Sequence, residues 1–263
     1  MVTQALAVNG AKVYITGRTR EKLERVTELY GKNISGEIIP IATDITSKES
    51  IAQLVQDVES REPALHILIN NAGISSSKGN TDAEDPKVLQ QELFQHPAST
   101  FDEWEDVFRT NVSQVFFATT AFLPLLTRGT ESDNQGWTST VINMTSISGI
   151  IKSSQHHFSY NSSKAAAIHL TKMLAHEVTS SGLRIRVNNI APGVFPSEMT
   201  AKVSSDESQK SAIGKEKYEH VPAGRPGKEE DMASAILFTA TNQYLNGQTV
   251  VIDGGYVLAT GSV

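Results

Sequence analysis

The stretch Leu65-His66-Ile67-Leu68-Ile69-Asn70-Asn71-Ala72-Gly73 is a short apolar run that ends in a polar, glycine-containing turn. Such a run is typical of a buried strand, and the turn after it marks the strand's carboxyl end. Similar runs recur along the chain with helical patterns between them, and the expected strands are 12–16, 37–43, 65–70, 139–145, 184–190 and 249–252. This alternation predicts an α/β fold in which helices cover both faces of a parallel sheet, as a single domain over residues 1–263.

The composition excludes several classes of protein. A chain of 263 residues with 39% hydrophobic residues can bury a sizeable core, while a formal net charge of -6 gives no basic surface for nucleic acid or an anionic membrane. The absence of Cys rules out disulfides and thiolate catalysis, and the seven His show no metal-ligand spacing. No signal peptide or apolar run of about 20 residues is evident. We therefore expect a soluble, cytoplasmic protein without a metal.

Tyr160 and Lys164 form the most informative pair in the chain. They are spaced i, i+4, so their side chains share one face of a helix. A Lys ammonium beside the phenol favours the ionised form, so we expect the pKa of Tyr160 to fall below its usual value of about 10. A general acid or base works best with a pKa near the operating pH. With six Tyr in the chain the pair alone is weak evidence, but Ser146 stands fourteen residues before Tyr160 and supplies context.

With its surroundings, this pair resembles the short-chain dehydrogenase/reductase family. The resemblance extends from about Ala5 to the C-terminus, in the family's own order. The matching pieces are Asp44-Ile45, Asn70-Asn71-Ala72-Gly73, Thr110-Asn111-Val112, Asn143-Met144-Thr145-Ser146, Tyr160 to Lys164, Asn188-Asn189-Ile190-Ala191-Pro192-Gly193, and 247–255. The run 192–200 is similar to the branch that includes 3-oxoacyl-acyl-carrier-protein reductases of the rhamnolipid-biosynthesis type. The resemblance implies a Rossmann-like, doubly wound sheet.

Catalytic roles for four residues follow from the resemblance. Ser146 would donate a hydrogen bond to the substrate carbonyl, Tyr160 would give or take the proton, and Lys164 would tune it. Asn111 would hold a water that connects Lys164 to solvent. In isolation Ser146 would read as an ordinary serine after a strand, and Asn111 as a helix-surface residue. Ser148 is the alternative to Ser146.

The resemblance also implies a dinucleotide site. Gly17 and Arg18 stand where an Asp or Glu would bind the ribose 2'-OH of NAD, so Arg18 favours the 2'-phosphate of NADP(H). Arg20 and Lys22 would assist, or all three cations are simply solvated. Asp44 would hydrogen-bond the adenine, although an Asp in a turn is common. The other residues expected to contact cofactor are Ile45, Asn71, Ala72, Gly73, Tyr160, Lys164, Pro192, Gly193, Phe195 and Ser197.

One part of the family pattern has no counterpart here. The family begins with a strand and a Gly-rich turn that binds the pyrophosphate at a helix N-terminus. In this sequence residues 1–10 read as that helix and lead directly into strand 12–16. The missing strand would lie between strands 12–16 and 65–70 in the order 3-2-1-4-5-6. We hypothesise an N-terminally truncated product.

The leading functional hypothesis is an NADP(H)-dependent oxidoreductase that transfers a hydride between nicotinamide and a carbonyl or alcohol substrate. A 3-oxoacyl thioester, carried by an acyl-carrier protein, is the first substrate candidate. The alternative is a catalytically inactive, truncated product that keeps part of the fold for binding or assembly. A sugar-nucleotide epimerase also uses Tyr-x-x-x-Lys, but 70–73 and 253–255 disfavour it.

Three segments carry further expectations. The polar stretch 200–226 is broken by Gly and Pro and is a candidate substrate lid. The stretches 75–99 and 128–137 are expected to be surface loops. In the family, helices equivalent to 103–126 and 160–180 form subunit interfaces, so we expect a homodimer or homotetramer.

Overall fold

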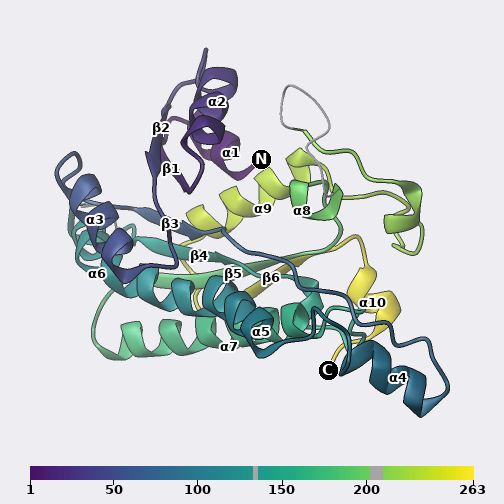
Figure 1. The fold of residues 1–263 in the computed structure, drawn as a ribbon. Helices are drawn as coiled ribbons and strands as arrows, with labels where there is room; N and C mark the ends of the chain where they lie inside the picture. The colour runs from purple at the N-terminus through teal and green to yellow at the C-terminus, as the bar shows by residue number, and fades with distance from the viewer. Residues whose placement is uncertain (133–135, 202–209) are drawn as a thin grey trace.

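The computed structural model describes residues 1–132, 136–201 and 210–263, and it shows the expected alternation of strands and helices (Figure 1). The strands are β1 Lys12–Gly17, β2 Glu37–Ala42, β3 Ile67–Asn70, β4 Thr140–Met144, β5 Arg186–Pro192 and β6 Thr249–Ile252. The main helices are α1 Val2–Val8, α2 Arg20–Tyr30, α3 Lys48–Glu59, α4 Pro86–Leu93, α5 Phe101–Phe108, α6 Gln114–Ser132, α7 Phe158–Ser180 and α9 Glu229–Thr241. Shorter helices are α8 Glu198–Ala201 and α10 Tyr256–Thr260. Each expected strand is present, and β6 has the predicted bounds.

The strands form two parallel sheets. One has the order β1-β2 and the other the order β3-β4-β5-β6. Among the described residues, no strand pairs with the facing edges of β1 and β3. This break lies where the sequence places the missing strand of the family, so the expected interruption of the sheet is confirmed.

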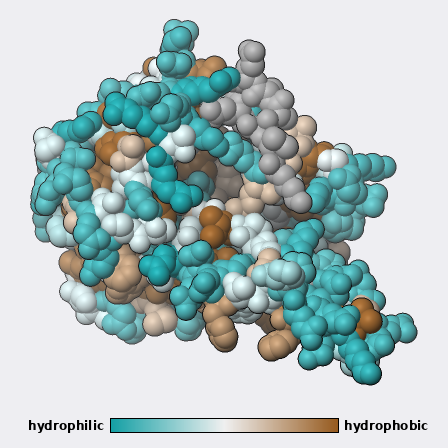
Figure 2. Space-filling view, viewed as in Figure 1, coloured by the Kyte–Doolittle hydropathy of each residue, from teal (hydrophilic) through white to brown (hydrophobic). Residues whose placement is uncertain are grey.

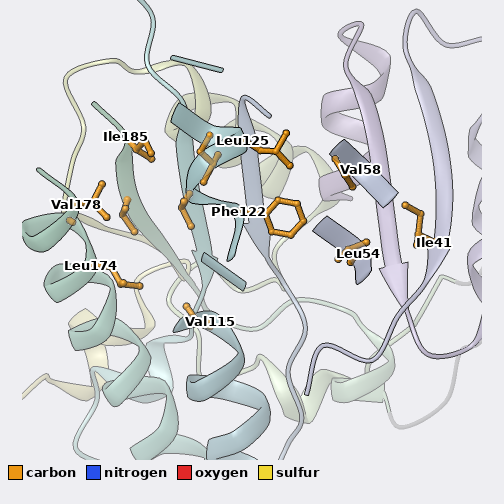
Figure 3. Packing of buried hydrophobic residues seen from close by; sticks show 13 residues of the cluster. Ile41, Leu54, Val58, Val115, Phe122, Leu125, Leu174, Val178 and Ile185 are labelled. Carbon is orange, nitrogen blue, oxygen red and sulfur yellow. The ribbon is translucent and has the colours of Figure 1, made fainter. Parts of the chain in front are cut away.

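Helices cover both faces of the four-stranded sheet. Helices α6 and α7 pack on one face, and α9, with α1 beside it, packs on the other (Figure 1). The core on the α6–α7 side includes Leu54 and Val58 of α3, Phe122 of α6 and Leu174 of α7 (Figure 3). Ile41 of β2 joins the same cluster. Apolar packing therefore connects the two sheets where backbone pairing is absent.

Both stretches expected to be loops contain helix. Within 75–99, Asp85 caps α4 by accepting a hydrogen bond from the Lys87 nitrogen, and Pro86 supplies a favourable first residue. Within 128–137, α6 continues to Ser132, and the Arg128 guanidinium holds this last turn through Glu59 at 2.7 Å. Residues 133–135 lie outside the described residues. In both stretches a cap or an ion pair stabilises helix turns that the polar composition alone does not predict.

Arg186 fixes the beginning of β5 from inside the protein. Its side chain is buried, and the guanidinium donates to the carbonyl oxygens of Thr138, Thr239, Ala240 and Asn242 over 2.8–3.2 Å. Burial lowers the pKa of Arg186. The cation thus satisfies carbonyls at the C-terminal end of α9 and ties that helix to the sheet.

Of the predicted lid, residues 202–209 lie outside the described residues. The described remainder holds part of α8 and a single 3-10 turn, Lys215–Lys217. The lid stays a prediction.

Candidate functional site

The predicted site residues gather at the carboxyl ends of the strands. Arg18 follows β1, Asp44 follows β2, Gly73 follows β3, Ser146 follows β4 and Gly193 follows β5. Strand ends of this kind share one edge of a parallel sheet, and such an edge is where ligands bind in α/β folds. Figure 2 shows exposed apolar residues near the centre of one face of the molecule, between hydrophilic margins. The local geometry of each group decides what this edge can do.

Tyr160 and Lys164 lie in the first two turns of α7, with Lys164 buried and Tyr160 half-buried. The Lys164 Nζ is 5.6 Å from the centroid of the Tyr160 ring and donates a hydrogen bond to the Met144 carbonyl oxygen at 3.0 Å. Met144 ends β4, two residues before Ser146. The structure therefore brings these three predicted catalytic side chains to one place, and Lys164 joins the helix to the strand.

The expected fall in the pKa of Tyr160 is wrong for this structure. Burial raises the pKa of Tyr160, and hydrogen bonding to Ser146 opposes that rise. Burial also lowers the pKa of Lys164 to about 8. The reason is that the phenolate loses more by desolvation than neighbouring groups restore. Tyr160 is accordingly a protonated acid at neutral pH.

Asn111 lies in a π-helical turn, Arg109–Ser113, between α5 and α6. Its side-chain amide donates to the Ile74 carbonyl at 3.0 Å and to the Ser163 Oγ at 3.0 Å, and its Oδ1 accepts from the Ile74 nitrogen at 2.9 Å. The amide is buried and fully engaged, so it does not resemble a helix-surface Asn. It ties the turn after β3 to the helix of Tyr160.

Gly73 is the point of closest approach in this arrangement. A Cβ at Gly73 would lie 3.1 Å from Asn111 Oδ1 and 3.4 Å from Lys164 Nζ. The missing side chain thus leaves open the space beside two predicted catalytic residues. Asn71 and Ala72 just before it are exposed at the end of β3.

Ser146, and not Ser148, is the serine available to a substrate. The Ser148 hydroxyl donates to Gln155 Oε1 at 2.8 Å, and Gln155 Nε2 donates to the Tyr256 hydroxyl at 2.9 Å. Ser146 Oγ accepts from the Ser148 nitrogen at 3.1 Å, and the Ser146 hydroxyl also hydrogen-bonds to the Tyr160 side chain. Ser146 and Tyr160 therefore lie together, where both hydroxyls can donate to an incoming oxygen.

At the far end of the edge, Arg18 is exposed and makes no ion pair within the described part of the chain. Arg20 is paired with Glu24 at 2.7 Å, and Lys22 with Glu198 at 3.0 Å. Of the three cations considered for a 2'-phosphate, Arg18 is thus the one with an uncommitted head group.

Asp44 also has a structural task. Its Oδ1 accepts from the Thr46 nitrogen at 2.9 Å and from the Thr46 hydroxyl at 2.7 Å. These bonds, chiefly the one from the hydroxyl, lower the pKa of Asp44. The half-buried Ile45 follows it. The second oxygen of Asp44 remains for a ligand.

The residues after β5 divide between backbone and core roles. Gly193 passes so close to Asp253 that a Cβ would lie 2.7 Å from the Asp253 Cα. The Phe195 side chain is buried in the core with Ile236 and other apolar residues, which leaves its backbone for a cofactor. Ser197 Oγ accepts from the Thr200 nitrogen at 3.2 Å. Pro192, which ends β5, is partly exposed.

Sequence reasoning missed Ser163 and Glu103. Ser163 lies inside the Tyr-x-x-x-Lys spacing, and its hydroxyl both accepts from Asn111 and donates to the Tyr160 carbonyl at 2.7 Å. Glu103 accepts from the Ser159 hydroxyl at 3.0 Å. The signal for Glu103 is its spacing three residues after Thr100, which is a capping-box pattern.

The described residues contain neither a metal-binding cluster nor a membrane-spanning helix. No group of three or more His, Asp or Glu is arranged to hold a metal ion. None of the helices in the described ranges combines the length and apolar character needed to cross a membrane.

Comparisons with known proteins agree on one family. Residues 1–257 match the family described as enoyl-(acyl carrier protein) reductase. The short-chain dehydrogenase/reductase PhomF' of Diaporthe leptostromiformis is 37% identical, with 100% of this chain and 88% of that protein covered. The rhamnolipids biosynthesis 3-oxoacyl-[acyl-carrier-protein] reductase of Pseudomonas aeruginosa is 33% identical over 98% of this chain and 91% of its own length.

Solved structures give the same answer. The Pseudomonas aeruginosa RhlG/NADP active-site complex matches with a TM-score of 0.76 and 31% identity, over 97% of this chain and 90% of that one. The structure of ElxO with NADP bound matches with a TM-score of 0.77 and 25% identity, over 98% and 93%. These comparisons lend no support to the alternative of an inactive, truncated product.

Proposed function

Because this chain belongs to the short-chain dehydrogenase/reductase family, we propose that it is an NADP(H)-dependent oxidoreductase whose catalytic residues are Ser146, Tyr160, Lys164 and Asn111. The observation that carries the proposal is the meeting of Lys164, Tyr160 and the end of β4 at the ligand-binding edge of the sheet. The reaction is the interconversion of a carbonyl and an alcohol.

The described residues fit both ends of a dinucleotide. The open space at Gly73, beside Lys164, suits the close approach of a flat ring to the backbone. Arg18, exposed after β1, suits the 2'-phosphate. Asp44 and Ile45, Asn71 and Ala72, and the backbone from Pro192 through Phe195 to Ser197 lie along the edge between these ends. Solved relatives with NADP bound support this choice of cofactor.

Proton transfer is assigned to Tyr160. Because burial keeps its pKa high, the phenol is protonated at neutral pH and can give its proton to the substrate oxygen. Ser146 donates a second hydrogen bond to the same oxygen and stabilises the charge that develops there. Lys164, 5.6 Å from the Tyr160 ring, places a cation beside the phenolate that remains. Bound NADPH supplies the hydride.

The substrate class we propose is a 3-oxoacyl thioester, presented by an acyl carrier. The support is the description of the matching family and the name of the 33% identical reductase. Segment 200–226 is proposed as the lid over this substrate, since it follows the strand end that carries Gly193.

We also propose a homo-oligomer formed through α6 and α7. Phe116 on α6 is 44% exposed and Met173 on α7 is 51% exposed, although both are large and apolar. Analytical ultracentrifugation should give a dimer or tetramer, and Phe116→Glu with Met173→Glu should shift it towards monomer. A wild-type monomer at micromolar concentration would contradict the proposal.

The decisive experiment is a spectroscopic assay of NADPH oxidation with acetoacetyl-coenzyme A, together with a direct NADPH titration. Tyr160→Phe should retain NADPH binding and lose turnover by roughly 100- to 10,000-fold, the range for loss of a general acid. Tyr244→Phe is the matched control, because Tyr244 is fully exposed. Turnover that survives Tyr160→Phe, or wild-type protein that binds no NADPH, would contradict the proposed function.

A further inference from the structure

We propose that Glu103 is a positioning residue for Tyr160, which it holds through the hydroxyl of Ser159. Glu103 is the third residue of α5, and Thr100 caps this helix by accepting from the Glu103 nitrogen at 3.1 Å. In a capping box, a Glu at this position turns back to the backbone N–H of the cap residue. Here the carboxylate binds two groups outside its own helix, the Ser77 nitrogen at 3.0 Å and the Ser159 hydroxyl at 3.0 and 3.1 Å.

Ser159 directly precedes Tyr160 in the first turn of α7. Ser159 as a whole is only 2% exposed, so its hydroxyl is buried away from bulk water and depends on protein acceptors. A hydrogen bond to a carboxylate is stronger than one between neutral groups. Both carboxylate oxygens of Glu103 lie within hydrogen-bond distance of the Ser159 hydroxyl, so this contact holds the first turn of α7 against α5. The backbone that carries the Tyr160 phenol is therefore fixed as well.

Two more contacts connect the segment after β3 to the turn before α7. The Gly79 nitrogen donates to the His156 carbonyl at 2.9 Å, and the Ser76 hydroxyl lies 3.0 Å from His157 Nδ1. Gln155 and His156 have φ angles of 52° and 65°, a region that residues other than glycine seldom adopt. The turn before α7 thus has an unusual conformation, and contacts from the segment after β3 hold it. The Glu103 carboxylate contacts both that segment, through the Ser77 nitrogen, and α7, through the Ser159 hydroxyl.

A positioning role and a purely structural role of Glu103 predict different effects of its substitution on turnover. The Tyr160 hydroxyl transfers the proton, whereas its expected contact with the cofactor is one among many, so a displaced phenol should lower kcat and leave NADPH affinity nearly unchanged. Displacement of a reacting group by about 1 Å can reduce the rate by about 100-fold. A purely structural Glu103 would instead lower the folded fraction and leave the kcat of the folded enzyme unchanged.

The experiment compares Glu103→Ala, Glu103→Gln and Ser159→Ala with wild type in the proposed NADPH-dependent reductase assay. We expect Glu103→Ala to lower kcat by roughly tenfold or more with unchanged NADPH affinity. Glu103→Gln should recover most of the activity, since its amide oxygen still accepts from Ser159. The double variant that combines Glu103→Ala with Ser159→Ala should lower kcat no further than the more damaging single substitution, because both substitutions break the same hydrogen bond. Glu105→Ala, on the exposed side of the same helix, is the matched control.

The inference rests on the proposed function, and a second measurement separates their failures. Hydrogen exchange of the backbone amides in the first turn of α7 should accelerate in Glu103→Ala and not in Glu105→Ala, whether or not the enzyme turns over. Wild-type protein without reductase activity would overturn the proposed function alone. Unchanged exchange, or unchanged kcat in active Glu103→Ala, would overturn the role of Glu103.

Discussion

The Nζ of Lys164 donates a hydrogen bond to the Met144 carbonyl oxygen across 3.0 Å, so the helix that bears Tyr160 is tied to the strand that precedes Ser146. The bond is made by a buried cation without an acidic partner in the described residues. A cation in this position is expensive to bury, and it neutralises readily. Catalysis and stability therefore make opposite demands on Lys164.

The first prediction concerns the stability of Lys164→Met. Burial lowers the pKa of Lys164 from 10.5 to about 8, so below pH 8 the folded protein holds a proton that its interior disfavours. The unfolded chain binds this proton more tightly, and the resulting cost to folding is complete below pH 8 and shrinks as the pH rises towards 10.5. Lys164→Met should raise the free energy of unfolding at pH 7 by roughly 1 to 3 kcal/mol, the pKa shift less the lost hydrogen bond. Urea unfolding at neutral pH measures it, and equal or lower stability would contradict the assigned burial cost.

A second prediction concerns the pH dependence of turnover. As the pH passes about 8, Lys164 loses the charge that stabilises the Tyr160 phenolate, whereas the phenol itself keeps its proton because its pKa is raised. The kcat for ketone reduction should therefore fall above pH 8 with a single ionisation. In Lys164→Arg the cation persists, so any remaining activity should stay level over the same range. A wild-type profile that is flat from pH 7 to pH 10 would exclude Lys164 as the titrating group.

Sequence predicted the order of the elements well because burial imposes visible periodicity. The β6 residues Thr249–Ile252 form the expected strand. The unpaired edges of β1 and β3 were also expected, because the sequence shows no match to the strand that lies between them in the family. Helix α4 escaped prediction because its cap, Asp85, lies in a polar stretch without apolar periodicity. A local helix cap can therefore stabilise a helix in a segment whose composition suggests a loop.

The site shows a different limit. The proximity of Tyr160, Lys164 and Ser146 could be predicted from their spacing together with the family resemblance, but the direction of the Tyr160 pKa shift depends on burial, which no spacing reveals. Arg186 is similar, since its carbonyl acceptors come from segments about fifty residues away. Contacts between distant segments set these properties, and a single sequence does not reveal them.

The third prediction tests cofactor preference at Arg18. A charge-assisted hydrogen bond contributes about 1.5 to 3 kcal/mol, so Arg18→Ala should raise the KM for NADPH by roughly 10- to 100-fold. The KM for NADH should hardly change, because NADH lacks the 2'-phosphate. Arg20→Ala is the matched control, since its guanidinium is already paired with Glu24 at 2.7 Å. Equal losses with both cofactors would show that Arg18 does not read the phosphate.

The fourth prediction is that Gly73→Ala separates folding from catalysis. The added methyl would lie 3.1 Å from Asn111 Oδ1 and 3.4 Å from Lys164 Nζ, so one of these side chains has to move by a few tenths of an ångström. Gly73 is not in the left-handed region, so its backbone suits alanine, and an overpacked contact at its edge should cost about 1 kcal/mol of stability, at the low end of the range for overpacking. The methyl also enters the space proposed for the nicotinamide, so NADPH affinity and kcat should both fall, by roughly tenfold or more. Thermal unfolding and NADPH titration on the same preparation measure the two effects. Normal NADPH binding by a folded Gly73→Ala protein would place the nicotinamide elsewhere along the edge.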